Sequence, residues 1–341
     1  MSNSNKNSST LIAQNIKLSP HVAVLIIEKL AEYGINSHDV LVGTGLQKEY
    51  LLSGENHISL KDMIALIENA VELAPEGGLG IRIGSAETIS TMGVLGYALM
   101  SCATEYEAAE IGLRFQQTAS STMLIEGSED QGRARIELKS MVPLGKALVF
   151  CVEENISGIC ATSSQYATEP VFPLEIHLNY PKPSYASLYE EYFNCPILYN
   201  QPHNVFWTRL PNDKPLQYTN PVSAKICINL VEQLVERYKN EEDLILQVRK
   251  ILLRKPGFFP SMNYVAEELA VSPRTLHRKL EELDFSFSEL VDDIRKDLAI
   301  DYLSQSNLTV TEISNFLGYS DESSFRRAFK KWTGKNPSHF R

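Results

Sequence analysis

The spacing of apolar residues along the chain predicts helices first, then strands, and then helices alone. Residues 19–33 open with Ser-Pro and repeat apolar residues at helical spacing, and residues 59–74 begin with a capping box formed by Ser59 and Asp62. Residues 94–117 keep the helical spacing and predict one or two more helices. The chain is therefore expected to begin with a helical layer.

Alternating apolar and polar residues follow these helices and predict strands. Residues 121–140 alternate on both sides of a Gly/Ser/Asp turn, which is typical of a β-hairpin. Leu174, Ile176 and Leu178 are expected on one face of another strand, and residues 197–211 predict a further pair of strands. This first part of the chain therefore has the pattern of an α+β domain.

From Asp243 onward, apolar residues recur only at helical spacing, and the strongly charged stretch before Asp243 predicts a linker. The expected fold is an α+β N-terminal sensor domain followed by an all-α C-terminal domain with two helix-turn-helix motifs joined by a long helix. The predicted parts are a disordered tail at 1–10, the effector-binding and dimerisation domain at 11–235, a linker at 236–242 and the DNA-binding domain at 243–341.

Two segments of the C-terminal part, residues 262–281 and 309–331, repeat one pattern. Each has a helix, a small residue, an apolar residue, a capping Ser and a second helix, which is the spacing of a helix-turn-helix. The second helix of such a unit buries an apolar pair and leaves polar residues outward for the major groove. The matched pairs are Leu269 with Leu317, Ala270 with Gly318, Val271 with Tyr319, Ser272 with Ser320, Leu276 with Phe325, and Leu280 with Phe329.

The outward residues of these two second helices are the candidate DNA contacts, because Arg forms bidentate hydrogen bonds with guanine and Glu accepts from cytosine. A linking helix of about 18 residues spans ~27 Å, near the ~34 Å of one DNA turn. The base contacts are assigned to Arg274, His277, Arg278, Glu322, Ser323 and Arg327, and the phosphate contacts to Ser272, Thr275, Arg326, Lys330, Lys331 and Lys335.

Charge alone does not predict DNA binding. The chain has a net charge of −10. Residues 242–341 contain 15 Lys and Arg and 15 Asp and Glu, whereas residues 1–241 contain 17 and 27. A late basic cluster of this kind is more often a solvated helix face. The prediction of DNA binding therefore rests on the repeated motif.

Residues 243–341 resemble the DNA-binding domain of the AraC/XylS family of bacterial transcription regulators. The resemblance lies in VAEELAVSPRTLHRKL, LVDDIRKDLAIDYL and the terminal GKNPSHFR, where Phe340 stands at a position often held by Tyr. It implies two helix-turn-helix motifs in successive major grooves of promoter DNA. It also implies activation through RNA polymerase and a place in the bacterial cytoplasm, on the nucleoid.

The N-terminal part resembles the larger, ligand-binding type of this family in residues 93–110 and 193–216. That resemblance implies a domain that senses a small organic effector and forms a homodimer. A candidate dimer helix at 222–238 has an apolar stripe of Ile226, Leu230, Leu234 or Val235, and Tyr238, although such a stripe packs within its own domain at least as often.

Other chemistry has little support in the sequence. No catalytic residue, metal site, cofactor or membrane span is expected, and the five cysteines fit a reduced compartment. Residues 77–84 (GGLGIRIG) are interpreted as a turn rather than a phosphate loop, and Cys195 as a structural residue. Arg82, Arg114, Arg133 and Arg135 are interpreted as ion-pair residues, and no effector residue is assigned.

Two alternatives to an effector-responsive regulator remain open. One is an enzyme with a DNA-binding appendage, which would show convergent groups with perturbed pKa values in an N-terminal pocket. The other is a regulator controlled by a partner protein, which would have a filled N-terminal core and an exposed apolar patch.

Overall fold

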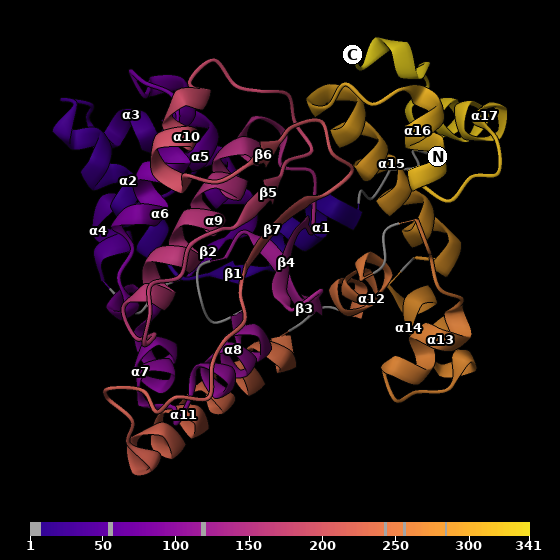
Figure 1. Ribbon diagram of the computed structural model, residues 1–341. Helices are drawn as coiled ribbons and strands as arrows, with labels where there is room; N and C mark the ends of the chain where they lie inside the picture. The colour runs from indigo at the N-terminus through magenta and orange to yellow at the C-terminus, as the bar shows by residue number, and fades with distance from the viewer. Residues whose placement is uncertain (1–7, 54–56, 117–120, 242–243, 255–256, 284) are drawn as a thin grey trace.

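The computed structural model describes the chain except for residues 1–7, 54–56, 117–120, 242–243, 255–256 and 284. An N-terminal domain of helices and strands lies beside a C-terminal domain made only of helices, as Figure 1 shows. None of the helices in the described part is both long and apolar enough to cross a membrane. The expected fold class is confirmed.

The helices of the N-terminal domain enclose two apolar clusters. Two short strands, β1 (Lys17–Leu18) and β2 (Ile58–Ser59), form an antiparallel pair among them. The helices are α1 (Ser8–Asn15), α2 (His21–Glu32), α3 (Ser37–Leu41), α4 (Lys48–Leu52), α5 (Leu60–Leu73), α6 (Leu79–Ala86), α7 (Gly93–Ser101), α8 (Glu105–Arg114), α9 (Leu148–Ser164), α10 (Ala186–Phe193) and α11 (Pro221–Glu241). One apolar cluster includes residues of α2, α5, α6 and α9, and the second is formed mainly by α7, α8 and α11.

A five-stranded sheet with the order β3-β4-β7-β5-β6 forms the centre of the domain. Strands β3 (Met123–Asp130) and β4 (Arg133–Ser140) are the predicted hairpin. Strands β6 (Ile197–Leu198) and β7 (Asn204–Arg209) are the two predicted strands, but they do not pair with each other. Instead β5 (Glu175–His177) lies between them, parallel to β6 and antiparallel to β7.

Residues 79–84 of the glycine-rich segment 77–84 belong to helix α6, and Gly77 and Gly78 precede it, so the interpretation of the segment as a plain turn was wrong for most of its length. Its glycines allow α6 to approach α9 closely. A Cβ at Gly80 would lie 2.4 Å from the carbonyl oxygen of Phe150, and a Cβ at Gly84 would lie 2.4 Å from that of Glu154. The segment therefore serves helix packing.

The C-terminal domain follows the predicted order of helices, with the long α15 between the two repeats. Its elements are α12 (Leu244–Leu253), α13 (Met262–Glu268), α14 (Pro273–Glu282), α15 (Phe287–Gln305), α16 (Val310–Phe316), α17 (Glu322–Thr333) and a terminal 3-10 turn at Pro337–His339.

Two predicted boundaries need correction. Helix α1 begins at Ser8, so the last three residues of the predicted tail are helical, and residues 1–7 lie outside the described part. Helix α11 continues to Glu241, so most of the predicted linker at 236–242 is helical. Charged residues on a long helix resemble a linker in composition, and this explains the second error.

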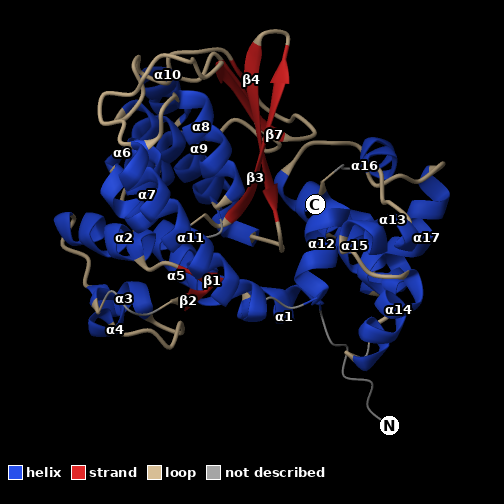
Figure 2. Cartoon of the chain, turned by 90° about the horizontal axis from the view of Figure 1, so that it is seen from below, coloured by secondary structure: helices blue, strands red, loops and turns tan. Residues whose placement is uncertain are grey.

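The sheet has two different faces, defined by the pairing of its strands. The pocket face carries Ile125, Gly127, Ala134, Ile136 and Thr208 and is turned toward α8 and α9. The charged face carries Glu126, Glu137 and Lys139 and is turned toward the C-terminal domain, where Lys139 Nζ donates a hydrogen bond of 2.5 Å to the carbonyl oxygen of Arg254. Figure 2 shows the strands between the helices of the two domains.

The two domains also share an apolar core. One continuous cluster runs from α2, α5 and α9 through α1 and α12 into the first helix-turn-helix, where it includes Leu276 and Leu280. The second helix-turn-helix has its own cluster, which includes Leu317, Phe325 and Phe329. The apolar core of the first unit is therefore continuous with that of the N-terminal domain, whereas the second unit has a core of its own and meets the N-terminal domain where the rings of Phe316 and His203 lie 6.2 Å apart.

Arg249 of α12 connects the domains by polar contacts. Its side chain is 4% exposed. Its Nε donates a hydrogen bond of 2.5 Å to the carbonyl oxygen of Met141, and its Nη2 lies 2.5 Å from Asp297 Oδ2 on α15. Ser9 of α1 donates to the same aspartate oxygen. Asp301 is also buried, and burial, with the nearby Asp297 charge, raises the pKa of its carboxyl.

Replacing Arg249 by Met should destabilise the protein strongly, because Asp297 would keep its buried charge without a counter-charge. A loss of about 3–5 kcal/mol in the free energy of unfolding is expected from urea denaturation. Arg254→Ala is the control, since Arg254 pairs with Glu268 at the surface and should cost about 1 kcal/mol or less. Equal effects of the two changes would show that Arg249 does not anchor the domains.

Candidate functional site

The first repeat forms the predicted helix-turn-helix from α13 and α14. Ala270 takes a left-handed conformation with φ of 53°, and Val271 N–H donates to the carbonyl oxygen of Ala266 at 2.9 Å, which closes the end of α13. Ser272 Oγ accepts from Thr275 N–H at 3.1 Å and caps α14 as predicted. Leu276 is 0% and Leu280 1% exposed. These two leucines therefore hold α14 against the core.

The second repeat has the same geometry in α16 and α17. Gly318 has φ of 76°, and a Cβ there would lie 2.7 Å from the carbonyl oxygen of Gly257, so glycine is required. Phe325 and Phe329 are both 0% exposed. The predicted capping residue, Ser320, is wrong: Asp321 Oδ1 accepts from Ser324 N–H at 2.8 Å instead. The longer second turn moves the cap one residue along the chain.

The predicted base contacts of α14 all lie on its exposed side. Arg274 is exposed, and His277 and Arg278 form ion pairs with Glu281 at 3.1 Å and Glu282 at 2.5 Å. Such exposed pairs within one helix are weak and can be exchanged for contacts with DNA. Ser272 and Thr275 bond to each other at 2.8 Å as part of the cap, so a phosphate would have to share these hydroxyls.

The predicted DNA contacts in and after α17 differ in whether their side chains are already hydrogen-bonded within the protein. Glu322 accepts from Thr311 Oγ1 and Arg326 Nε at 2.5 and 2.6 Å, and these hydrogen bonds lower the pKa of its carboxyl. Arg327 Nη2 contacts Ser324 Oγ at 3.2 Å. The remaining predicted contacts are exposed, and they are Ser323, Lys330, Lys331 and Lys335. In Figure 1, α14 and α17 lie in the C-terminal domain on the side away from the sheet.

The N-terminal domain contains two adjoining cavities. The larger cavity has a volume of about 630 Å³ and lies between α8, the pocket face of the sheet and the end of α9. Its lining is mainly apolar, as expected for an organic ligand of drug size. Residues that line it include Met92, Leu113, Ile125, Ile136, Ile159 and Tyr166. No residue of this cavity was assigned from the sequence, because its walls come from segments far apart in the chain.

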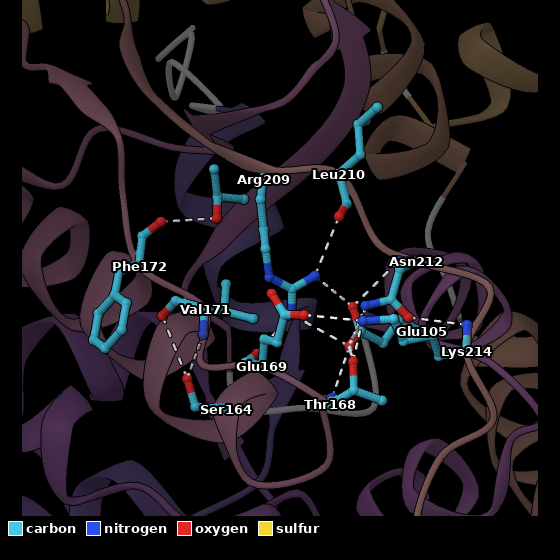
Figure 3. Close-up of polar contacts among 11 residues, drawn as sticks. Glu105, Ser164, Thr168, Glu169, Val171, Phe172, Arg209, Leu210, Asn212 and Lys214 are labelled. Atoms are coloured by element: carbon cyan, nitrogen blue, oxygen red, sulfur yellow. Dashed lines mark hydrogen bonds and ion pairs between the residues drawn. The ribbon is translucent and has the colours of Figure 1, made fainter.

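A polar cluster around Glu105, drawn in Figure 3, includes Glu105 and Arg209, which both line the larger cavity. Glu105 is 4% exposed, and its two carboxylate oxygens lie 2.6 and 3.2 Å from the Arg209 guanidinium. Thr168 and Asn212 donate further hydrogen bonds to it. These bonds hold the pKa of Glu105 below its usual value although burial acts in the opposite direction. The cluster fixes α8 to the end of β7.

A smaller cavity of about 80 Å³ adjoins the larger one, and Met92, Ser121, Ile125, Ile159 and Thr162 line both. The smaller cavity contains two carboxyl groups, those of Glu87 and Glu154. The sequence signal for Glu154 was its place beside Glu153 in the mainly apolar segment LVFCVEENISGICA, and Glu87 had no such signal. Which face of the helix Glu154 occupies becomes clear only from the packing of α9.

The four arginines predicted to form ion pairs do so. Arg82 pairs with Glu76 at 2.8 Å, Arg114 with Glu232 at 3.1 Å, Arg133 with Glu175 at 3.0 Å and Arg135 with Glu137 at 3.0 Å. The five cysteines are all free, and burial raises the pKa of the partly buried Cys195 thiol to about 11. A thiol with this pKa is protonated at neutral pH and is not a reactive nucleophile.

Comparison with known proteins agrees with this geometry. The model of the arabinose-binding N-terminal domain of AraC transcription regulators matches residues 34–210, and that of a helix-turn-helix domain matches residues 265–341. The chain belongs to the AraC family of transcription regulators. It is a DNA-binding transcription regulator of the AraC type, with an N-terminal domain similar to the arabinose-binding domain.

Two of its relatives match over nearly the whole chain. The ornithine utilization regulator of Pseudomonas aeruginosa is 33% identical, and the match covers 94% of both chains. An uncharacterized helix-turn-helix regulator of Mycobacterium tuberculosis is 29% identical over 93% of this chain and 94% of its own. The crystal structure of the regulator CdpR from Pseudomonas aeruginosa aligns with 94% of this chain and 97% of its own, at 21% identity and a TM-score of 0.47.

Proposed function

We propose that this AraC-type regulator activates transcription in response to a small organic effector bound in the larger cavity. The observation that carries the proposal is the position of the sheet, which lines the cavity with one face and contacts the DNA-binding domain with the other. A ligand that favours one arrangement of the sheet shifts the population of arrangements in which the DNA-binding domain fits its site.

The DNA-binding half of the proposal assigns base contacts to Arg274, His277 and Arg278 of α14 and to Ser323 and Arg327 of α17. Glu322 joins them once it exchanges Arg326 for a cytosine amino group. The phosphate contacts are Ser272, Thr275, Arg326, Lys330, Lys331 and Lys335. Activation would proceed through contact with RNA polymerase at the promoter, on the nucleoid in the bacterial cytoplasm.

Replacing Arg278 and Arg327 together by Ala should abolish selection of specific promoters. The measurement is sequencing of genomic fragments retained by the purified protein at about 150 mM salt, where non-specific binding is weak. Each lost base contact should cost about 1–3 kcal/mol of specificity. Lys330→Ala should instead weaken binding to all sequences alike and reduce the salt dependence.

Promoters retained equally by the double variant and the wild type would contradict the assignment of these base contacts. The control is Lys182→Ala, which removes an exposed charge from the N-terminal domain.

If the protein is an activator, transcripts of the genes next to the retained promoters should fall in cells that lack it. A rise would indicate repression.

Filling the larger cavity should remove the response to effector and leave DNA binding intact. Ala134 lies on the pocket face of β4, and Ala134→Trp would occupy the space beside it. The measurement is promoter binding with and without the small-molecule fraction of a cell extract. Ala134→Ser is the matched control, because it adds little volume. A tryptophan variant that responds like the wild type would rule out this cavity as the effector site.

We further propose that α11 forms a homodimer with a second copy of the chain. Its side facing away from α7 exposes Val222, Ile226 and Leu230 at intervals of four residues, with exposures of 67%, 55% and 44%. Val235 of the predicted stripe is buried within the domain, and the side chain of Tyr238 lies outside the described part. An apolar stripe on a long helix is suited to pairing with its own copy.

Changing Ile226 and Leu230 to Asp should convert this dimer to a monomer, because two charges would be buried at the contact. Light scattering after size-exclusion chromatography gives the mass in solution. Lys225→Asp places a charge on the same helix beside the stripe and should leave the mass unchanged. A wild-type protein with the mass of one chain would contradict the proposal and favour a partner protein at this stripe.

A further inference from the structure

The two adjoining cavities differ in chemistry. The larger one is mainly apolar, whereas the smaller one is lined by Glu87 and Glu154 together with Asn155 and Ser121. Glu87 follows α6, and Glu154 belongs to α9. A ligand that extends from one cavity into the other would therefore have an apolar body and a polar end.

The two carboxyl groups of the smaller cavity are held in place by the packing of α9. Glu87 lies against Gly158, where an added Cβ would be 2.9 Å from both of its carboxylate oxygens. Glu154 is 5% exposed and accepts a hydrogen bond of 2.6 Å from Asn155 Nδ2, while Asn155 Oδ1 accepts one of 2.8 Å from Ser121. Glu87 Oε1 is buried without a nitrogen or hydroxyl donor among the described residues, and the carboxyl groups of Glu87 and Glu154 are hydrogen-bonded to each other.

These carboxyl groups have no positive partner among the described residues. No Lys or Arg lines the smaller cavity. The two arginines that line the larger cavity, Arg135 and Arg209, are ion-paired with Glu137 and Glu105 at 3.0 and 2.6 Å. Burial raises the pKa of Glu87 to about 7, and burial together with the Glu87 charge raises the pKa of Glu154. The pair is therefore partly protonated near neutral pH.

We propose that the effector is an organic cation, with a protonated amine or guanidine between Glu87 and Glu154 and an apolar body in the larger cavity. The proposal rests on the proposed function, in which these cavities bind the effector. A protonated nitrogen donates hydrogen bonds to both carboxyls in place of the proton that they share, and it supplies the positive charge that both lack. An anionic group would be repelled by the carboxyls, and a neutral group would leave them without a counter-charge.

A metal ion fits this site less well than a protonated nitrogen. Calcium takes six or more oxygen ligands, and magnesium requires near-octahedral geometry. No group of three or more His, Cys, Asp or Glu side chains suited to a metal occurs in the part of the chain that the structure describes. The remaining titratable group of the smaller cavity is His21, and burial lowers its pKa, so it is neutral and does not repel a cation.

The test uses the full-length protein and three probes of equal length: hexylammonium, 1-hexanol and hexanoate. Calorimetry at neutral pH should show hexylammonium binding about tenfold or more tightly than hexanol, with hexanoate weakest. Glu87→Gln and Glu154→Gln should each remove most of this preference. Glu28→Gln, at an exposed position of α2 that lines neither cavity, is the matched control and should retain it.

Proton release distinguishes direct contact from a structural role of the two carboxyls. A cation between them lowers their pKa values, so binding of hexylammonium should release protons, and the measured enthalpy should change with the ionisation enthalpy of the buffer. Hexanol should release none. This readout in the wild-type protein decides the matter even where a Gln variant fails to fold.

Equal affinity for the three probes, tighter binding of hexanoate, or hexylammonium binding without proton release would each overturn the assignment of a cation. So would the absence of binding by any probe. The proposed function has a separate test, because Ala134→Trp can abolish the response to cell extract whatever the charge of the effector. The protein could prefer hexylammonium although neither cell extract nor Ala134→Trp changes its promoter binding. That result would support the assignment of a cation and contradict the regulatory role of the site.

Discussion

The buried contact of Arg249 with Met141 and Asp297 is the constraint on which the arrangement of the two domains depends. A guanidinium with 4% exposure is tolerated only where oxygen acceptors contact it, and here they come from Met141, the residue after β4, and from Asp297 of α15. The contact therefore favours the described orientation of the sheet relative to the DNA-binding domain. Two further contacts stabilise the same orientation. Lys139 on the charged face of the sheet bonds to Arg254, and the apolar core continues from one domain into the other.

The local parts of the structure could be predicted from the sequence, since they depend on spacing within a few residues. The hairpin of β3 and β4, the caps at Ser59 and Ser272, and the buried pairs of α14 and α17 follow from such spacing. The capping position in the second motif was missed because one inserted residue moved the cap from Ser320 to Asp321. The insertion of β5 between β6 and β7 was missed because pairing of distant strands leaves no local signal.

The candidate DNA contacts could also be predicted from local spacing, whereas the cavities could not. The exposed residues of α14 and α17 follow one another at helical spacing, so the sequence placed them on one side of each helix. The carboxyl pair brings together Glu87 and Glu154, which are distant in the chain and meet only because the glycines of α6 and Gly158 of α9 allow close packing. A pair of glutamates in an apolar helix marks an unusual position without revealing its partner.

The separate apolar cores of the two helix-turn-helix units have a consequence for how such a regulator changes over generations. A substitution inside the first unit disturbs packing that continues into the N-terminal domain, so its effects reach both domains. The second unit has a core of its own and meets the N-terminal domain at Phe316, whose ring lies beside that of His203. Substitutions in the second unit are therefore expected to disturb the N-terminal domain less than those in the first, which leaves the second unit freer to change its DNA contacts.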